Sequence, residues 1–167
     1  MSNGLTANEQ RVAALEAQLQ IERLIYSYGH NLDFGDIDAY ADMFAEDATL
    51  EIQGYFVVVA GLQVPFPYET EGLASGGVRT DRGIAFKGRS AIRGFVTKRQ
   101  PNRRSLHVSS QPLIELVSAD TATARTYMRV YSQEHSKIPE IRVVGRYLDT
   151  FAKTNTGWKF KTRICEI

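Results

Sequence analysis

The sequence predicts an α+β fold: a cone-shaped α+β barrel in which a strongly curved, mainly antiparallel sheet wraps around N-terminal helices. Apolar residues recur at spacings of three and four over residues 8–32, which indicates an amphipathic helix. From residue 105 onward, strand-forming residues are separated by short turn sequences, which is typical of antiparallel strands. Helices at one end of the chain and strands at the other favour α+β over a doubly wound sheet. The interior of such a cone can hold a ligand.

The chain has the size and composition of one globular domain. Of its 167 residues, 43% are hydrophobic and 23% are charged, and we expect a single domain over residues 1–167. The 20 basic and 19 acidic residues leave a net charge of +1, so neither nucleic acid nor an anionic membrane is an expected partner. No apolar run approaches the roughly 20 residues of a membrane span.

Cysteine content and the N-terminal residues predict a cytoplasmic location. Cys165 is the only cysteine, which excludes an internal disulfide and is consistent with a reducing compartment. Since no convincing base lies near it in the sequence, we expect Cys165 to be a buried structural thiol. Charges interrupt the apolar positions near the N-terminus and exclude a signal-peptide core; they are Glu9, Arg11, Glu16, Glu22 and Arg23.

Two helices are expected before any strand. The first extends from Asn8 to Leu32, and Gly35 ends it. Its apolar face is expected to comprise Val12, Leu15, Leu19, Ile21, Leu24, Ile25, Tyr28 and Leu32. Asp36 is a good N-cap for a second, short helix whose apolar stripe comprises Ile37, Tyr40, Ala41 and Phe44.

The middle of the chain predicts a strand, a long loop and a third helix. The strand is expected over residues 49–59, and residues 60–82, rich in glycine and proline, are expected to form the loop. The loop is either a solvated linker or a lid over a site, and its aromatic residues Phe66 and Tyr68 favour the lid. The third helix begins near Gly88 and Ser90 and is closed by Pro101.

Four strands are expected to complete the chain, over residues 105–117, 121–132, 141–153 and 158–167. The breaks between them contain turn-forming residues at Ser118–Asp120 and Asn155–Gly157, and a polar segment around Glu134–Lys137. These links are mostly of hairpin length, so consecutive strands are expected to be antiparallel neighbours.

The motifs that the sequence lacks leave acid–base chemistry by side chains as the expected activity. It contains no nucleotide-binding glycine loop, no GxSxG, no HExxH and no cluster of cysteine and histidine at metal-ligand spacing. With three histidines in the chain, a histidine-rich metal site is not expected, and no cofactor is expected either.

Four residues are candidates for that chemistry, although each has an ordinary structural explanation. His107 interrupts an otherwise apolar or small strand segment, as a hydrogen-bonded core histidine also does. Asp33 ends the first helix, where a carboxylate often caps a turn. Tyr28 lies on the apolar stripe of that helix, and Arg163, in the last strand, is expected at the surface if it has no special role.

A resemblance to a known family gives the four candidates a common meaning. The chain resembles the SnoaL-like proteins of the nuclear-transport-factor-2-like superfamily over nearly its whole length. The resemblance is carried by Leu32-Asp33-x-Gly35-Asp36-x-Asp38-Ala39-Tyr40-x-x-Met43-Phe44-x-x-Asp47-Ala48, then Gly88-Arg89-Ser90-Ala91-Ile92-x-x-Phe95, His107, Thr123-Ala124-Arg125, Gly145-x-Tyr147-x-Asp149 and Gly157-Trp158-Lys159-Phe160. It implies a cystatin-like or nuclear-transport-factor-2-like fold.

The resemblance also implies roles for the candidates. Within the family, the chain resembles scytalone dehydratase, bile acid 7α-dehydratase and hexachlorocyclohexane dehydrochlorinase. These enzymes share a carboxylate–histidine dyad, which Asp33 and His107 match. Tyr28 falls where the bile acid enzyme has a tyrosine, and Arg163 where the dehydrochlorinase has an arginine. The second histidine of scytalone dehydratase aligns near Thr126, which argues against scytalone as the substrate.

The chemistry explains why these residue types are suitable. Removing a proton beside an activating group needs a base with a pKa near neutrality, which imidazole supplies. A carboxylate bonded to the other ring nitrogen fixes the tautomer and stabilises the imidazolium that forms. Tyr28 would donate to a leaving hydroxyl or an oxyanion, and Arg163 would hold negative charge there.

The ligand pocket is expected to be lined by aromatic residues, either as a substrate wall or as ordinary core: Tyr55, Phe66, Tyr68 and Tyr147. Tyr147 is the best candidate because its strand position matches a ligand-facing one in the dehydratases. His30 precedes Asp33 by one helical turn and is either a support for the dyad or, as we prefer, a surface residue.

These features together predict a cofactor-independent lyase. The expected reaction is a dehydratase-like elimination or a retro-aldol-type cleavage of a hydrophobic aromatic or polycyclic small molecule. The same base would serve an isomerase or a polyketide cyclase, and the fold also occurs in non-catalytic binding or assembly modules. The family resemblance further implies a homo-oligomer, either a trimer or a dimer, commonly formed through the outer face of the sheet.

Overall fold

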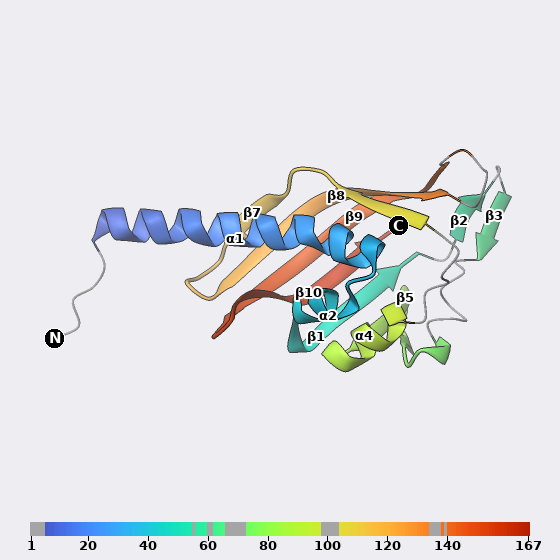
Figure 1. Ribbon diagram of the computed structural model, residues 1–167, viewed down its shortest axis with the longest axis horizontal. Coiled ribbons are helices and arrows are strands. Elements are labelled where there is room, and N and C mark those ends of the chain that lie inside the picture. The colour runs from blue at the N-terminus through green and yellow to red at the C-terminus, as the bar shows by residue number, and fades with distance from the viewer. Residues whose placement is uncertain are drawn as a thin grey trace.

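The computed structural model describes residues 6–54, 56–59, 62–65, 73–97, 104–133, 138 and 140–167. They form an α+β structure in which helices lie against a large, open, curved sheet (Figure 1). Of the expected pocket residues, Tyr55, Phe66 and Tyr68 lie outside the described residues. The described helices include none that is both long enough and apolar enough to cross a membrane.

The first helix, α1, spans Ala7–Phe34, as the periodicity predicts. Thr6 and Glu9 form a capping box at its start, and Gly35, with φ of 82°, ends it in the left-handed region. Its buried residues begin only at Ala17. The expectation that the apolar face starts earlier is wrong, because the first turns extend past the sheet (Figure 1) and leave three apolar side chains more than half exposed: Val12, Leu15 and Leu19.

The second helix is shorter than expected and the first strand starts earlier. Helix α2 spans Ile37–Asp42, and the carboxylate of Asp36 caps it by accepting from the Ala39 amide at 3.0 Å. Strand β1 spans Phe44–Gln53, so Phe44 lies in the strand and not in the helix. The side chain of Phe44 is fully buried, and its backbone pairs with that of Phe160 in the last strand.

The single strand expected over residues 49–59 is two strands, because Gly54 interrupts it with a φ of 131°. Strand β2 spans Phe56–Val59 and pairs with β3, Leu62–Pro65, in a separate two-stranded sheet. The predicted loop over residues 60–82 is therefore partly wrong. It contains β3 and also β4, Val78–Arg79, which pairs with β5, Gly83–Lys87.

Helix α4 spans Arg89–Thr97 and packs beside α2 and β1. Its inward side chains are Ile92 and Val96, which are buried, and Phe95, which is partly buried against the core. The expected strand over residues 105–117 is divided into β6, Arg104–Ser109, and β7, Leu113–Leu116. Pro112 lies in the break between them, where a residue without a backbone N–H cannot continue the ladder.

The remaining strands agree with the sequence, and their order in space places the last strand inside the sheet. They are β8, Thr121–Gln133, β9, Glu140–Thr154, and β10, Gly157–Glu166. The order across the large sheet is β4-β5-β1-β10-β9-β8-β6, with β7 also paired to β8. The pair β1–β10 is parallel and the others are antiparallel. Helix α1 crosses this sheet and contacts β6, β7 and β10 (Figure 1).

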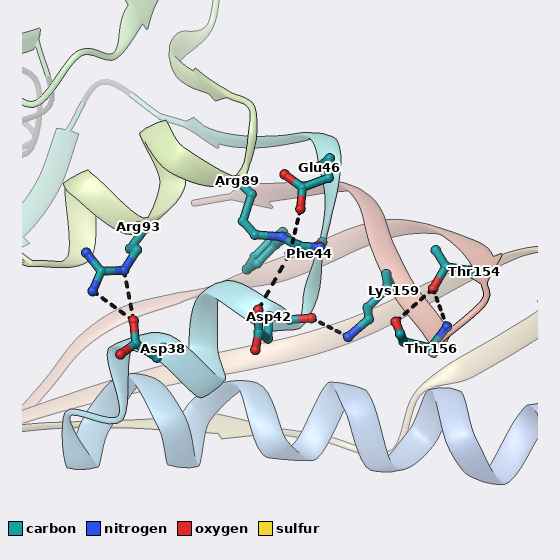
Figure 2. A network of polar contacts seen from close by, with 9 residues as sticks. All are labelled: Asp38, Asp42, Phe44, Glu46, Arg89, Arg93, Thr154, Thr156 and Lys159. Atoms are coloured by element: carbon teal, nitrogen blue, oxygen red, sulfur yellow. Dashed lines mark hydrogen bonds and ion pairs between the residues drawn. The ribbon is translucent and has the colours of Figure 1, made fainter.

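Polar contacts join α4 to the segment that contains α2 and the start of β1 (Figure 2). Arg93 Nε and Nη2 lie 2.9 and 2.8 Å from Asp38 Oδ1, and Arg89 Nη1 lies 2.7 Å from Glu46 Oε1. Arg89 Nε also donates to the backbone carbonyl of Phe44 at 2.8 Å. Surface ion pairs of this kind contribute about 0–1 kcal/mol each, so the packing of the buried face of α4 is the main attachment.

Candidate active site

The structure brings Asp33 and His107 together. His107 Nδ1 lies 2.5 Å from Asp33 Oδ1, and the backbone N–H of His107 donates to Asp33 Oδ2 at 2.6 Å. Both side chains are largely buried, with 12% of His107 and 4% of Asp33 exposed. A carboxylate without a proton can only accept hydrogen bonds, so in the tautomer with its proton on Nδ1 the ring donates to Asp33 Oδ1 and its lone pair is on Nε2. A general base needs such a lone pair.

The two partners are positioned by the last turn of α1 and by β6. The Asp33 carboxylate holds both the ring and the backbone of His107, and the Ser105 hydroxyl, also on β6, donates to Asp33 Oδ1 at 3.4 Å. Gly29 allows the helix and the strand to approach closely, because a Cβ atom there would lie 2.5 Å from the carbonyl oxygen of His107. The dyad therefore depends on one small residue a turn before Asp33.

His107 also lines a hollow beneath α1, α2 and α4, between those helices and the concave side of the sheet. The space inside it that is open to a water-sized sphere is about 70 Å³. The lining is mostly apolar, with hydroxyl groups, a thiol and the imidazole as its polar groups: Tyr28, Leu32, Tyr40, Leu50, Ile52, Phe95, His107, Met128, Val130, Val143, Tyr147, Cys165 and Ile167. The hollow thus joins a potential base to an apolar binding space.

Tyr28 lies on the wall of the same hollow and beside the histidine. Its ring meets that of His107 edge-on with the centroids 6.5 Å apart, and 4% of the residue is exposed. The hydroxyl of Tyr40, from α2, donates a hydrogen bond to the Tyr28 hydroxyl oxygen at 3.3 Å. The structure therefore places a phenol pair and an imidazole on one wall.

Arg163 is fully buried, so the expectation of a surface position in the absence of a special role is wrong. Its Nε and Nη2 donate to the two oxygens of Asp149 at 2.8 and 2.7 Å, and the Asp149 side chain is also fully buried. The guanidinium carbon lies 4.0–4.1 Å from three ring centres, those of Tyr28, Tyr147 and Phe160. Arg163 is not among the residues that line the hollow; it lies against the Tyr28 ring that lines it.

Burial determines the protonation of the groups around Arg163. Burial raises the pKa of the Asp149 carboxyl, and the ion pair with Arg163 opposes that effect. For Arg163 burial alone lowers the pKa, but the contact with Asp149 outweighs it and the guanidinium stays charged. The pKa of Tyr147 lies well above its usual value, chiefly because of burial. The cluster is thus a buried cation and its counter-ion beside the neutral phenol of Tyr147.

The other predicted residues divide into those the structure locates and those outside the described part. Tyr147 lines the hollow and meets the Tyr28 ring with a centroid distance of 5.6 Å. His30 is exposed and stacks on Phe34, which agrees with the preferred surface position. Cys165 is buried as expected, although it also borders the hollow. The placement of Tyr55, Phe66 and Tyr68 on the pocket wall stays a prediction.

Sequence reasoning did not identify Tyr40, Asp149 and Gly29 as parts of this site. Tyr40 and Asp149 occur within the motifs that carry the family resemblance, yet neither had a separate signal of function. Tyr40 reads as one more apolar position of a short helix. An acidic residue at an inward position of a strand, as at Asp149, does predict a buried partner, and that signal was available. The requirement for Gly29 depends on the approach of β6, which no local pattern shows.

Comparison with known proteins agrees with this architecture. The model of the SnoaL-like domain matches residues 13–164. A search of curated proteins found no match.

Solved structures show the same fold at low sequence identity. An NTF2-like protein with a cystatin-like fold from Novosphingobium aromaticivorans has a TM-score of 0.72 and 22% identity, covering 100% of this chain and 92% of that one. From the same organism, a protein described as a candidate scytalone dehydratase has a TM-score of 0.63 and 20% identity, with 93% and 86% covered. The beta subunit of a candidate aromatic-ring-hydroxylating dioxygenase, also from that organism, has a TM-score of 0.65 and 19% identity, with 92% and 90% covered. These similarities confirm the expected fold.

Proposed function

This chain belongs to the SnoaL-like domain family, and from that premise we propose that it is a cofactor-independent lyase acting on a hydrophobic aromatic or polycyclic small molecule. The observation that carries the proposal is the 2.5 Å contact between His107 Nδ1 and Asp33 Oδ1, at a histidine that lines an apolar hollow. A similar protein is described as a candidate scytalone dehydratase, which is a lyase.

His107 is the general base in the proposed mechanism. With Nδ1 bonded to Asp33, Nε2 takes a proton from carbon next to an activating group, and the carboxylate stabilises the imidazolium that forms. Tyr28 donates its proton to the departing oxygen. The charge of Arg163, 4.0 Å from the centre of the Tyr28 ring, favours the negative charge that then develops on the phenol oxygen. These transfers give elimination of water or another group. In a retro-aldol-type cleavage, Nε2 instead takes the proton of the β-hydroxyl group, the carbon–carbon bond breaks as a carbonyl forms, and Tyr28 donates to the enolate oxygen that develops.

The lining of the hollow indicates the substrate class. Apolar side chains from the helices and the sheet surround the imidazole, and the rings of Tyr28 and Tyr147 provide flat aromatic surfaces. Such walls select size and hydrophobicity, and a few polar groups fix the orientation of the ligand. We therefore propose a substrate with at least one ring and with an oxygen function that reaches the Tyr28 hydroxyl.

A substrate screen of paired variants tests the proposal. Wild type and His107→Ala are incubated with hydroxylated aromatics, steroids and polyketide-like compounds, and products are followed by mass spectrometry. We expect turnover by wild type to fall about 10²–10⁴-fold in His107→Ala, the usual contribution of one positioned base. His30→Ala is the matched control because His30 is an exposed histidine of α1 that does not line the hollow. Turnover that survives in His107→Ala at the level of this control would remove the proposed base.

The same screen distinguishes a lyase from an isomerase or a polyketide cyclase. A lyase releases a second product, so the mass of the main product is lower than that of the substrate by the mass of the leaving group. An isomerase gives a rearranged product of unchanged mass. A cyclase also releases no carbonyl fragment or halide, but its product has one more ring. The mass balance therefore separates a lyase from the other two, and the number of rings in the product separates a cyclase from an isomerase.

We also propose that the protein forms a homo-oligomer through the outer face of its sheet. Residues adjacent to the inward-facing His107, Met128 and Val143 point to the opposite face of their strands. Those outward side chains are apolar and between 47% and 75% exposed: Leu106, Val108, Tyr127 and Val144. A face of this kind is typical of a protein interface.

Light scattering after size-exclusion chromatography tests the oligomer. Wild type is expected to have two or three times the monomer mass of 18.7 kDa, and Tyr127→Glu is expected to shift it toward the monomer. Val78→Glu serves as the control because Val78 is also exposed, at 56%, but lies on β4 at the other edge of the sheet. A monomeric wild type at micromolar concentration would refute this part of the proposal.

A further inference from the structure

The hollow is too small for a substrate that contains a ring. The space in it that is open to a water-sized sphere is about 70 Å³. An apolar cavity of about 150 Å³ admits one benzene molecule. Because protein interiors are closely packed and have low compressibility, the missing space has to come from a part of the lining that can move. The part that moves therefore decides which ligands enter.

The exposure of the lining residues shows where the hollow opens. Most of them are buried, but Val130, Val143 and Ile167 are only partly buried, as are Phe95 and His107. Val130 and Val143 are cross-strand neighbours near the end of β8 and the start of β9, and Ile167 directly follows β10. Among the described residues, the mouth is therefore bordered by one end of the sheet, by His107 on β6 and by Phe95 on α4.

Phe95 is the residue of the mouth that can make room. The ring of His107 is held by Asp33 at 2.5 Å, and valine and isoleucine are branched at Cβ and stiff at χ1. An aromatic side chain in a helix has two common χ1 rotamers instead, so the helix backbone allows the Phe95 ring a second position. Phe95 is also the largest residue at the mouth, so its movement frees the most space.

A ring stack favours the present position of Phe95. Its ring lies on that of Phe86 with the centroids 4.2 Å apart and an angle of 25° between the planes. Phe86 is fully buried on β5 and pairs with Leu50 of β1, which lines the hollow. Ile92 and Val96 are buried on the same helix as Phe95, so the ring can turn while α4 stays in place. An aromatic pair favours the stacked position only about two- to twelvefold, which the binding of a ligand can overcome.

We propose that Phe95 determines the size of the ligands that the hollow admits. In the stacked position its ring narrows the hollow, and a compound with one or more rings binds only after Phe95 has turned to its other rotamer. This inference rests on the proposed function, because it assigns the ring-containing substrate of that function to this hollow. It gives Phe95 no part in the chemistry. Since only the turned form binds, the observed affinity is reduced by the fraction of molecules in that form.

Ligand binding tests the proposal without any turnover. Phenol, with one ring, and 2-naphthol, with two fused rings, are titrated into wild type and Phe95→Ala, and the imidazole signals of His107 are followed by proton–nitrogen NMR. His107 lines the hollow, and the signals of the exposed His30 reveal binding elsewhere. Removing the ring abolishes the stacked position, so the affinity for 2-naphthol is expected to rise about two- to twelvefold. The affinity for phenol is expected to rise less, because the smaller ligand needs less of the space that Phe95 occupies.

Val96→Ala is the matched control for a general loosening of the helix. It also shortens an apolar side chain of α4, but Val96 does not line the hollow, so both affinities are expected to stay within about twofold of wild type. If Phe95→Ala unfolds in a thermal melt, Phe95→Leu removes the ring while keeping an apolar side chain, and the expected change has the same sign. Phe95→Trp places a larger ring at the mouth and is expected to weaken the binding of 2-naphthol.

The proposal requires opposite changes from the smaller and the larger residue at position 95. Equal affinities in wild type, Phe95→Ala and Phe95→Trp overturn it, as does a rise in Val96→Ala equal to that in Phe95→Ala. It is also overturned if neither compound moves the His107 signals in Phe95→Ala, because the widened hollow should admit at least the single ring. The proposed lyase is tested separately by the His107→Ala screen, so a protein that binds in this way can still lack that activity.

Discussion

Replacing Gly29 with alanine adds one methyl group at the point where α1 comes closest to β6. The new Cβ atom would lie 2.5 Å from the carbonyl oxygen of His107, whereas ordinary contacts of such atoms begin at 3.4 Å. The helix must therefore move away from the strand by about 0.9 Å, or the strand must yield by the same amount. Because the obstacle is backbone, no side-chain rotation relieves the contact. The Asp33–His107 bond spans this same gap, so it is expected to lengthen or break.

The energetic cost can be isolated with a second glycine. Gly94 lies in α4, and a Cβ atom there would meet only the Ser75 carbonyl oxygen, at 4.0 Å. Alanine is favoured over glycine inside a helix by about 1 kcal/mol. This gain is common to Gly29→Ala and Gly94→Ala, so it cancels in their comparison. The remaining difference is the cost of overpacking, about 1–3 kcal/mol in favour of Gly94→Ala.

Two measurements check the expectation for Gly29→Ala. Urea denaturation gives the free energy of unfolding of each variant, and long-range proton–nitrogen NMR of the imidazole rings shows which nitrogen of His107 carries the proton. Wild type and Gly94→Ala should keep the His107 proton on Nδ1, next to Asp33, and Gly29→Ala should lose that preference. If Gly29→Ala is as stable as Gly94→Ala and retains the wild-type tautomer, the argument that Gly29 sets the spacing of the dyad is wrong.

Two further predictions concern buried groups of β9 and β10. Asp149→Asn leaves the Arg163 charge buried without its counter-ion and is expected to reduce the free energy of unfolding, measured by urea denaturation, by about 3–5 kcal/mol. The control Asp38→Asn breaks the exposed pair with Arg93 and should reduce the same free energy by less than about 1 kcal/mol. Equal losses in the two variants would contradict the reasoning. Burial raises the pKa of the Cys165 thiol from 9.0 to about 12, so its thiolate fraction at pH 8 is about a thousandfold lower than that of an exposed thiol. Iodoacetamide should therefore label Cys165 only after the protein unfolds. Rapid labelling of the folded protein would show that this thiol is accessible and ionised.

The parts of the fold that the sequence predicted are those with a local cause. The long helix follows from the spacing of its apolar residues and ends at Gly35, and the cap at Asp36 follows from its short acceptor side chain. The late strands follow from β-branched and aromatic residues between turn sequences. Because each of these signals lies within the element that it specifies, the elements were placed within a few residues of their observed ends.

The parts that the sequence missed depend on distant partners. Phe44 belongs to β1 and not to α2 because its backbone pairs with that of Phe160, more than 100 positions later. The stripe of Val12, Leu15 and Leu19 has correct helical spacing, yet the sheet does not extend far enough to cover it. The break at Pro112 had a local signal that the prediction did not use.

The candidate site shows the same division. Asp33 and His107 were identified from the family resemblance, and the structure adds the 2.5 Å contact that no spacing in the sequence contains. The burial of Arg163 follows from its pairing with Asp149 on the neighbouring strand, so composition alone placed it wrongly at the surface. The catalytic roles of these residues, the single domain over residues 1–167 and the cytoplasmic location stay predictions.

The position of β10 has a consequence for how the molecule assembles during synthesis. Within the part of the chain that the structure describes, β10 alone hydrogen-bonds to β1 on one side and to β9 on the other, so it joins the two halves of the large sheet. Until residues 157–166 have left the ribosome, this connection between the early and the late half of the sheet is missing. Non-local pairing of this kind delays folding. The nascent chain therefore has to keep two incomplete sheet edges apart from other chains until its final strand is available.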